Sequence, residues 1–336
     1  MKNITKVGLS ALAGALAVTS ANAGDMSLSG SMEASYTTGS GYSDVGNPLG
    51  MDKELSVTAS GELDDGTSVS YKQTITDAMA YNDSELKFGT SMGDIAMTSA
   101  GSPLSAIDDV TPNAFEEANA LLGSIDDVNG VDGTYGIRYT LADAMGSGFT
   151  VDAMYTPRHG SGDAQADNST SGSTGIEGNG SGYELVVKGS VPMISGLDVG
   201  AGYAKLEKRT NETTADDSES IDQHEGTAYI NYAMGPVKVG YQVGAVTMGT
   251  SNKEYKTKYL GVSYAVSDNL SVSYNDIQSD FTNQTGASTE QDFESVSASY
   301  TMGSMTLSIA DSEVSNATYT DARSVDATSI SMAIAF

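Results

Sequence analysis

The residues of this chain best suited to chemistry are carboxylates gathered in one long polar segment, residues 101–131. A connection of this length is unusual in compact folds and often carries function. Carboxylates on one loop can attract cations and orient polar solutes where the surrounding space is narrow. For each acid taken singly, a solvated loop residue is the alternative interpretation. The six acids are Asp108, Asp109, Glu116, Glu117, Asp126 and Asp127.

Signals for covalent or metal chemistry are weak. Cysteine is absent and no G-x-S-x-G sequence occurs, so the common nucleophile arrangements are missing. The two histidines, His159 and His224, fall in expected loops without metal-ligand spacing, and we expect both side chains to be polar groups in contact with water at the surface. The stretch DDVNGVDG, residues 126–133, lacks the Asp spacing and the closing Glu of a calcium loop. We predict no enzyme and no cofactor, with calcium bound by acids of segment 101–131 as a minor hypothesis.

Charge and the N-terminus narrow the class of protein. The chain has 44 acidic and 16 basic residues and a formal net charge of −28, which would repel nucleic acid. A basic start with Lys2 and Lys6, an apolar stretch over 7–18 and the sequence Ala21-Asn22-Ala23 form the three parts of a secretory signal. We therefore predict a signal peptide over residues 1–23 and a mature fold over residues 24–336.

From residue 24 onward, apolar and polar residues alternate with a period of two, which is typical of β-strands. The last ten residues, ATSISMAIAF, keep this alternation up to the terminal Phe336. No helical period follows residue 23. The alternation predicts sixteen strands, at 26–37, 52–62, 66–77, 83–90, 93–100, 132–142, 147–157, 181–191, 196–208, 225–234, 236–249, 254–266, 269–282, 290–302, 304–315 and 324–336.

The expected connections alternate strictly between tight turns and longer polar loops, as in a meandering transmembrane barrel. One face of the strands is apolar, whereas the other carries mainly Ser, Thr, Gly and short charged residues, which do not fill a dry core. Hydrocarbon is the remaining partner for the apolar face, and a sheet in lipid must close on itself. We therefore predict an all-β fold, a sixteen-stranded antiparallel transmembrane β-barrel with an aqueous lumen. By the same alternation, Lys72, Lys87 and Arg138 face that lumen.

The signal sequence, the sixteen alternating segments, the long third loop and the terminal Phe336 together resemble the general bacterial porins, most closely the alphaproteobacterial type. The pattern covers the whole mature chain, although the absence of Trp departs from many porins. The resemblance implies that the third loop, 101–131, folds into the lumen as a constriction, with its acids facing a basic cluster on the opposite wall. It also implies the outer membrane of a Gram-negative bacterium, a homotrimer, and recognition of the final strand, ending in Phe336, by the barrel-assembly machinery.

The expected function is passive diffusion of small hydrophilic solutes and ions, with weak cation selectivity set by the acidic charge. Outer-membrane lipid and lipopolysaccharide are the expected partners. The acidic loop 209–224 is interpreted as solvated surface, and a bridge by divalent cations to lipopolysaccharide is a further hypothesis for it. Two alternatives remain open. A substrate-specific channel would show an aromatic or basic track in the lumen, and a secreted acidic β surface protein without a channel would share the signal and the charge. The natural solute, conductance, size cutoff and gating do not follow from the pattern.

Overall fold

The computed structural model describes residues 25–41, 47–76, 81–119, 125, 127–131, 135–159, 179–208, 222–249 and 253–336. The predicted signal peptide, Asp126 and most of the acidic loop 209–224 lie outside the described residues. In the described part, no helix is long and apolar enough to cross a membrane. The short helices found there are 3₁₀ turns: η1 (Ser105–Ile107), η2 (Glu116–Asn119), η3 (Ala144–Gly146) and η4 (Ala317–Tyr319).

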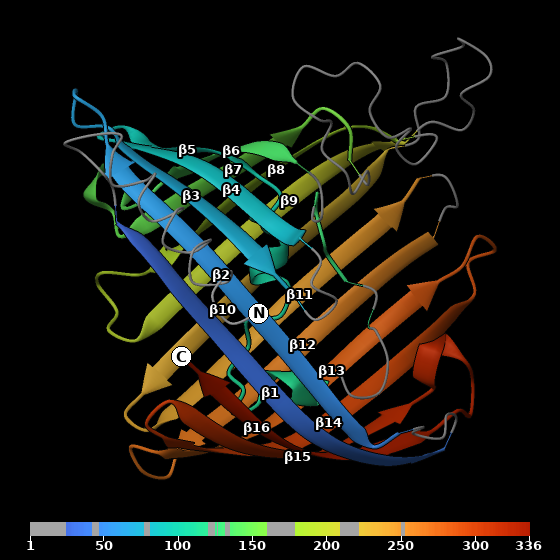
Figure 1. Cartoon of the computed structure of the whole chain (residues 1–336). Coiled ribbons are helices and arrows are strands. Elements are labelled where there is room, and N and C mark those ends of the chain that lie inside the picture. The colour runs from blue at the N-terminus through green and yellow to red at the C-terminus, as the bar shows by residue number, and fades with distance from the viewer. Residues whose placement is uncertain are drawn as a thin grey trace, which may run out of the picture.

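Sixteen strands form one closed barrel in which each strand pairs antiparallel with its neighbours in sequence (Figure 1). The predicted fold class and number of strands are confirmed. The strands are β1 (Met26–Gly41), β2 (Leu49–Glu62), β3 (Ser68–Ile75), β4 (Tyr81–Thr90), β5 (Gly93–Thr98), β6 (Gly136–Leu141), β7 (Phe149–Thr156), β8 (Asn179–Ser190), β9 (Leu197–Lys208), β10 (Gln223–Met234), β11 (Val237–Met248), β12 (Lys253–Ala265), β13 (Leu270–Thr282), β14 (Ser288–Met302), β15 (Met305–Ser315) and β16 (Val325–Ala335).

The barrel closes where the last strand pairs with the first. Ser31 of β1 lies opposite Ala335 of β16. The Phe336 amide donates a hydrogen bond to the Gly30 carbonyl at 2.9 Å, and the Gly30 amide donates to the Phe336 carbonyl at 2.8 Å. A Cβ atom on Gly30 would lie 2.7 Å from Cε2 of the Phe336 ring, so glycine makes room for the terminal ring. The predicted pairing of the final and first strands is confirmed.

The strict alternation of tight turns and longer loops is wrong in part. The β13–β14 connection, 283–287, was expected among the longer loops, yet the Asn283 amide donates to the Ala287 carbonyl at 2.9 Å. The Asn283 side chain also accepts hydrogen bonds from the amides of Thr285 and Ala287, which stabilises a tight turn. The β6–β7 connection, 142–148, was expected to be tight but contains η3. Strand ends also differ: β1 extends to Gly41, and β6 begins at Gly136.

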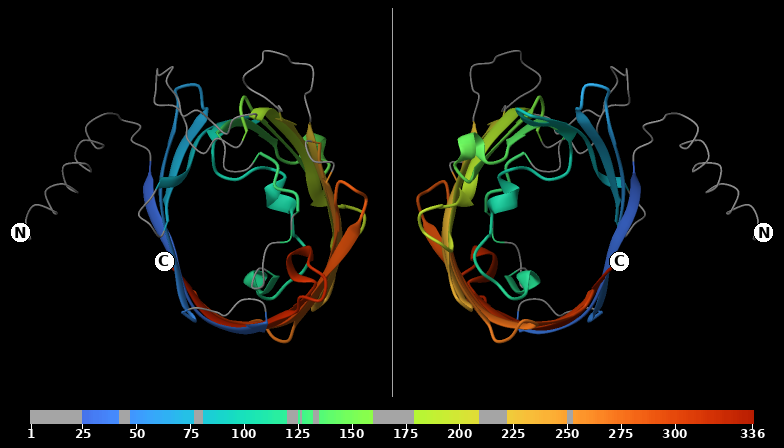
Figure 2. Two further views of the ribbon diagram at one scale, coloured as in Figure 1. Left: turned by 90° about the vertical axis from the view of Figure 1, so that its right-hand side faces the viewer. Right: turned by 90° about the vertical axis from the view of Figure 1, so that its left-hand side faces the viewer.

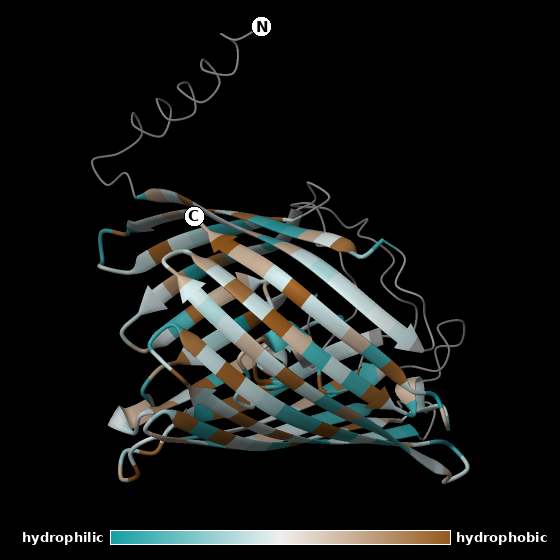
Figure 3. Ribbon diagram, turned by 90° about the horizontal axis from the view of Figure 1, so that it is seen from below, coloured by the Kyte–Doolittle hydropathy of each residue, from teal (hydrophilic) through white to brown (hydrophobic). Residues whose placement is uncertain are grey.

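Large apolar side chains point away from the barrel, as the alternation predicts. On β16 the side chain of Ile330 is 51% exposed, whereas its neighbours Ser329 and Ser331 are 2% exposed. Figure 3 shows hydrophobic and hydrophilic positions alternating along the strands of the wall. Exposed apolar surface of this extent needs an apolar partner, which for a closed barrel is the lipid bilayer.

The inner face is less uniformly polar than the sequence suggested. A cluster of apolar side chains is buried on inward positions of β12 to β16, where Ile125 of the third loop and Ala317 of η4 pack on it. The prediction that this face forms no dry core is therefore wrong for this part of the wall, because chain segments inside the barrel cover it. The buried strand residues of the cluster are Tyr259, Ile277, Phe293, Val314 and Val325.

Candidate channel constriction

The described part of the third loop lies inside the ring of strands (Figure 2). It leaves the wall after β5, passes through η1 and η2, and returns to the wall before β6. Its contacts run along the inner faces of β8 to β15, so it crosses much of the barrel circumference.

Amide side chains on the wall hold the backbone of the third loop. The Gln242 side chain is completely buried, and its Nε2 donates to the carbonyl oxygens of Ile107 at 2.8 Å and Asp108 at 2.5 Å. Its Oε1 accepts a hydrogen bond from the Val110 amide at 2.9 Å. Further along, Ser312 of β15 donates to the Ala118 carbonyl at 2.9 Å. Because buried backbone groups need such partners, these bonds fix the position of the loop.

Apolar packing adds to these bonds. Leu104, Ile107 and Val128 of the third loop are buried against strand residues that include Val186. Burial of a side chain of this size stabilises the folded state by about 2 kcal/mol. A Cβ atom on Gly202 of β9 would lie 2.6 Å from Cδ1 of Leu104, so this glycine permits the close approach of the loop to the wall.

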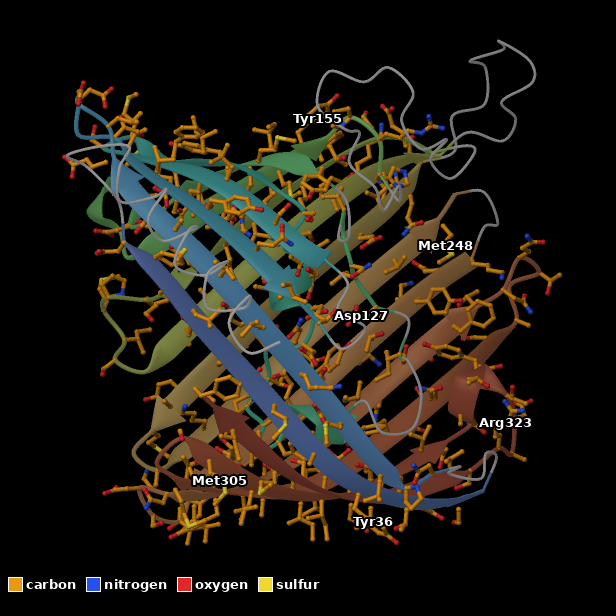
Figure 4. The ribbon with its side chains drawn as sticks, viewed as in Figure 1. Tyr36, Asp127, Tyr155, Met248, Met305 and Arg323 are labelled. Carbon is orange, nitrogen blue, oxygen red and sulfur yellow. The ribbon has the colours of Figure 1, made fainter. Side chains whose placement is uncertain are left out.

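Three of the predicted acids, Asp108, Asp109 and Asp127, form one electrostatic group. Burial raises the pKa of Asp108 to about 6, and the charge of Asp127 adds to the shift. Burial and the charges of Asp108 and Glu116 raise the pKa of Asp109 to about 7. Burial also raises the pKa of Asp127 to about 6, against the opposing hydrogen bonds from the Tyr259 hydroxyl and the Val128 amide. Figure 4 shows Asp127 in the interior of the barrel.

Glu116 and Glu117 lie in η2, in the middle of the third loop. Burial raises the pKa of Glu117, and the nearby carboxylates Glu33 of β1 and Asp52 of β2 raise it further. The third-loop acids thus continue into wall acids at both ends, because Glu225 of β10 acts on Asp127. We call this series the carboxylate row; it comprises Glu225, Asp127, Asp108, Asp109, Glu116, Glu117, Glu33 and Asp52.

The predicted basic residues make contacts of their own on the wall of β3 to β7. Lys72 lies opposite Glu85 in the β3–β4 pairing. The ammonium group of Lys87 is 3.7 Å from a carboxylate oxygen of Asp94. The Arg138 guanidinium forms a bidentate ion pair with the Asp152 carboxylate. This carboxylate also accepts a hydrogen bond from the Thr140 hydroxyl at 3.1 Å.

Two acids of the wall that contact the third loop, Glu225 and Glu184, were not among the predicted site residues. Glu225 accepts hydrogen bonds from the amides of Asn129 and Gly130, both at 2.7 Å. Glu184 of β8 accepts one from the Leu104 amide at 3.3 Å. The alternation contained the signal, since Glu33 and Glu184 each lie between two outward apolar residues and so face the lumen.

The histidines differ from the prediction. His159 is 5% exposed rather than on the surface, and its Nε2 lies 2.7 Å from the Glu207 carbonyl oxygen. His224 belongs to β10 rather than to a loop, and its ring stacks on Tyr203. In the ranges that the structure describes, no group of three or more His, Asp or Glu side chains is arranged to hold a metal ion.

Comparisons with known proteins agree with this architecture. The chain is similar to OmpF of Salmonella typhi in complex with daunomycin (TM-score 0.66, 13% identity, covering 93% of this chain and 98% of that chain). It is similar to an anion-selective porin from Comamonas acidovorans (TM-score 0.66, 14% identity, 93% and 100%). It is also similar to the trimer form of OmpT, an outer membrane protein of Vibrio cholerae (TM-score 0.65, 12% identity, 93% and 99%).

These solved structures share the fold of this chain. At identities of 12–14%, the similarity is evidence for the fold alone and not for a shared function. No curated protein matches the chain. A family model for Gram-negative porins matches residues 8–310, which is most of the sequence. This chain therefore belongs to the Gram-negative porin family and forms a β-barrel channel of the outer membrane.

Proposed function

We propose that the barrel passes small hydrophilic solutes and ions by diffusion, with a weak preference for cations set at the third loop. The carboxylate row supports this proposal, because neighbouring carboxylate charges contribute to the raised pKa of four of its loop members, Asp108, Asp109, Glu117 and Asp127. On the opposite wall, Lys87 and Arg138 are paired with Asp94 and Asp152, which reduces the positive charge available to attract anions. Diffusion makes and breaks no bond and needs no resident cofactor.

The preference is expected to be weak and local. Screening at physiological salt limits a charge to a range of about 8 Å, so only groups beside the passing ion act on it. The anion-selective porin from Comamonas acidovorans has a similar fold, and the sign of selectivity therefore depends on side chains rather than on the barrel itself.

A homotrimer is part of the proposal and is supported by the trimer form of the similar protein OmpT. Insertion is proposed to use the final strand, whose terminal Phe336 is exposed on the barrel and paired with Gly30. Lipopolysaccharide remains the proposed partner of the acidic loop 209–224.

The zero-current potential of the purified protein in a planar bilayer with a tenfold KCl gradient tests the selectivity. We expect the sign for cation preference, and a smaller potential when Asp108, Asp109, Glu116 and Glu117 are changed to their amides. The matched control is Asp311→Asn with Glu313→Gln on the outward face of β15, which should leave the potential unchanged. A clear anion preference of the unmodified protein would contradict the proposal.

A further inference from the structure

A second polar site lies beneath the third loop, on the side of the short turns and apart from the carboxylate row. It is a pocket of about 280 Å³ between the loop and the inner faces of β9 to β12. One wall residue is acidic and another is basic. The residues that line the pocket include Asp198, Asn231, Lys238 and Ser263 of the wall, and Val110, Pro112 and Asn113 of the loop.

The roof of the pocket is held in place. The Asn231 side chain donates a hydrogen bond to the Val110 carbonyl at 2.7 Å, and the Asn275 side chain donates to the Pro112 carbonyl at 3.2 Å. A Cβ atom on Gly240 would lie 2.3 Å from Cδ of Pro112, so the loop touches the strand backbone there. These contacts hold the loop against the wall near Pro112. The loop residues that line the pocket are therefore fixed in position relative to the strands.

Two hydroxyl groups donate hydrogen bonds that orient the acidic residue of the pocket, Asp198. The Tyr229 hydroxyl donates to Oδ2 of Asp198 at 3.0 Å, and the Ser190 hydroxyl donates to Oδ1 at 3.3 Å. A carboxylate has about four acceptor positions, so Asp198 retains capacity for a further donor.

The basic residue that lines the pocket, Lys238, is available to a ligand. Lys238 has no ion pair with any residue that the structure describes. In the strand pairing, Asp198 lies opposite Asn231, and Lys238 lies opposite Ala233 of the same strand. Sheet spacings then separate the Cα atoms of Asp198 and Lys238 by roughly 12 Å, a span that a small ligand between the two side chains can bridge.

We propose that this pocket is a subsite for small zwitterions of the amino-acid type, with the carboxylate on Lys238 and the ammonium group on Asp198. An acid alone would favour cations and a base alone would favour anions, whereas the two together across one pocket favour a solute that carries both charges. The hydroxyl of Ser263 and the side chain of Asn113 offer further polar contacts to such a solute. The volume of about 280 Å³ suits a small amino acid.

This inference rests on the proposed function, because the subsite acts on solutes that pass the third loop. The charges border water, so each contact is weak, and a weak site beside a narrow passage raises the local concentration of a solute without trapping it. The expected consequence is faster entry of zwitterions than of neutral solutes of the same size.

Swelling of proteoliposomes in L-alanine and in lactamide, a neutral molecule of similar size, tests the subsite. We expect the unmodified channel to admit L-alanine faster by about three- to fivefold, within the range that a few exposed charge contacts supply. In Lys238→Gln and in Asp198→Asn this ratio should fall to about one, with little change in the entry of lactamide. The matched control is Lys188→Gln, a change to an inward lysine of β8 that does not line the pocket and should keep the ratio.

The outcomes separate the two proposals. If neither solute enters, the diffusion function itself fails. If both solutes enter the unmodified channel at equal rates, diffusion stands and the zwitterion subsite is wrong. Loss of the preference in Lys188→Gln to the same degree as in Lys238→Gln would also overturn the subsite, because the effect would then come from general lumen charge. The equal-rate comparison needs no variant, so a variant that fails to fold does not decide the test.

Discussion

Lowering the pH from 8 to 5 is expected to reduce the cation preference of the channel, with a midpoint between pH 6 and 7. The reason lies in three third-loop acids, since the pKa of Asp109 is raised to about 7 and those of Asp108 and Asp127 to about 6. A carboxyl group carries its negative charge only above its pKa. These groups therefore lose charge while ordinary exposed carboxylates, with a pKa near 4, remain ionised.

The size of the effect follows from Coulomb's law. A unit charge about 6 Å from a passing monovalent ion changes the ion's energy by roughly 0.7 kcal/mol in water. Salt at 0.1 M reduces this by about half. Because the change has opposite signs for K⁺ and Cl⁻, the loss of one carboxylate lowers the ratio of cation to anion permeability by roughly fourfold.

The assay is the zero-current potential in a KCl gradient, recorded at pH values from 4 to 8. In the variant Asp108→Asn with Asp109→Asn we expect a lower ratio at pH 8 and a much smaller change between pH 8 and 5. The control Asp311→Asn removes an outward carboxylate from β15 and should titrate like the unmodified channel. A midpoint below pH 5, or an unchanged titration in the double variant, would refute the role assigned to these acids.

Three further predictions concern the contacts inside the barrel. The variant Asp109→Asn should raise the thermal stability at pH 8 but not at pH 4. The pKa of Asp109 is raised to about 7 in the folded state, so the protonated carboxyl group is favourable for folding at low pH. This contribution to the stability is lost as the pH rises through about 7 and the buried group ionises. The variant Gln242→Leu leaves the carbonyl groups of Ile107 and Asp108 without their donor and should cost about 1–3 kcal/mol of loop anchoring, visible as added noise in the open-channel current; a current as quiet as that of the unmodified channel would contradict this. The variant Tyr319→Ala removes a ring that lies 5.5 Å from the ring of Phe281, together with a hydroxyl contact to Ser279 at 2.8 Å; segment 316–324 should then be cleaved faster by added protease, whereas unchanged cleavage would show that these contacts do not hold it.

The sequence predicts the barrel wall well because a strand's side chains alternate strictly between two faces. That rule is local, so it correctly places Ile330 outside and Ser329 inside without knowledge of the rest of the fold. The ion pair of Arg138 with Asp152 follows from the pairing of two neighbouring strands. Arg138 lies opposite Met154, and Asp152 is two residues away from Met154 on the same face of the sheet. Interactions of this kind can be predicted once the pairing of the strands is known.

The anchoring of the third loop is not local. Gln242 looks like an ordinary lumen residue in its own strand, yet its partners Ile107 and Asp108 lie more than a hundred residues away in sequence. Alternation identifies the face of a residue but not the chain segment that will cover it. For the same reason, the apolar inward residues Ile277 and Phe293 contradicted the expectation of a wet inner wall.

Those apolar residues lie beside one acid of the constriction, Asp127. Tyr259 packs in the same cluster as Ile277 and Phe293, and its hydroxyl donates to Asp127. Anchoring the third loop on the inner wall removes water from the carboxylates that the loop carries, and this loss of water is the largest cause of the raised pKa of Asp108, Asp109 and Asp127. A fully polar inner wall would leave the same acids hydrated and ionised down to pH values near 4. The pH range in which selectivity changes is therefore set by the packing beneath the loop as much as by the acids themselves.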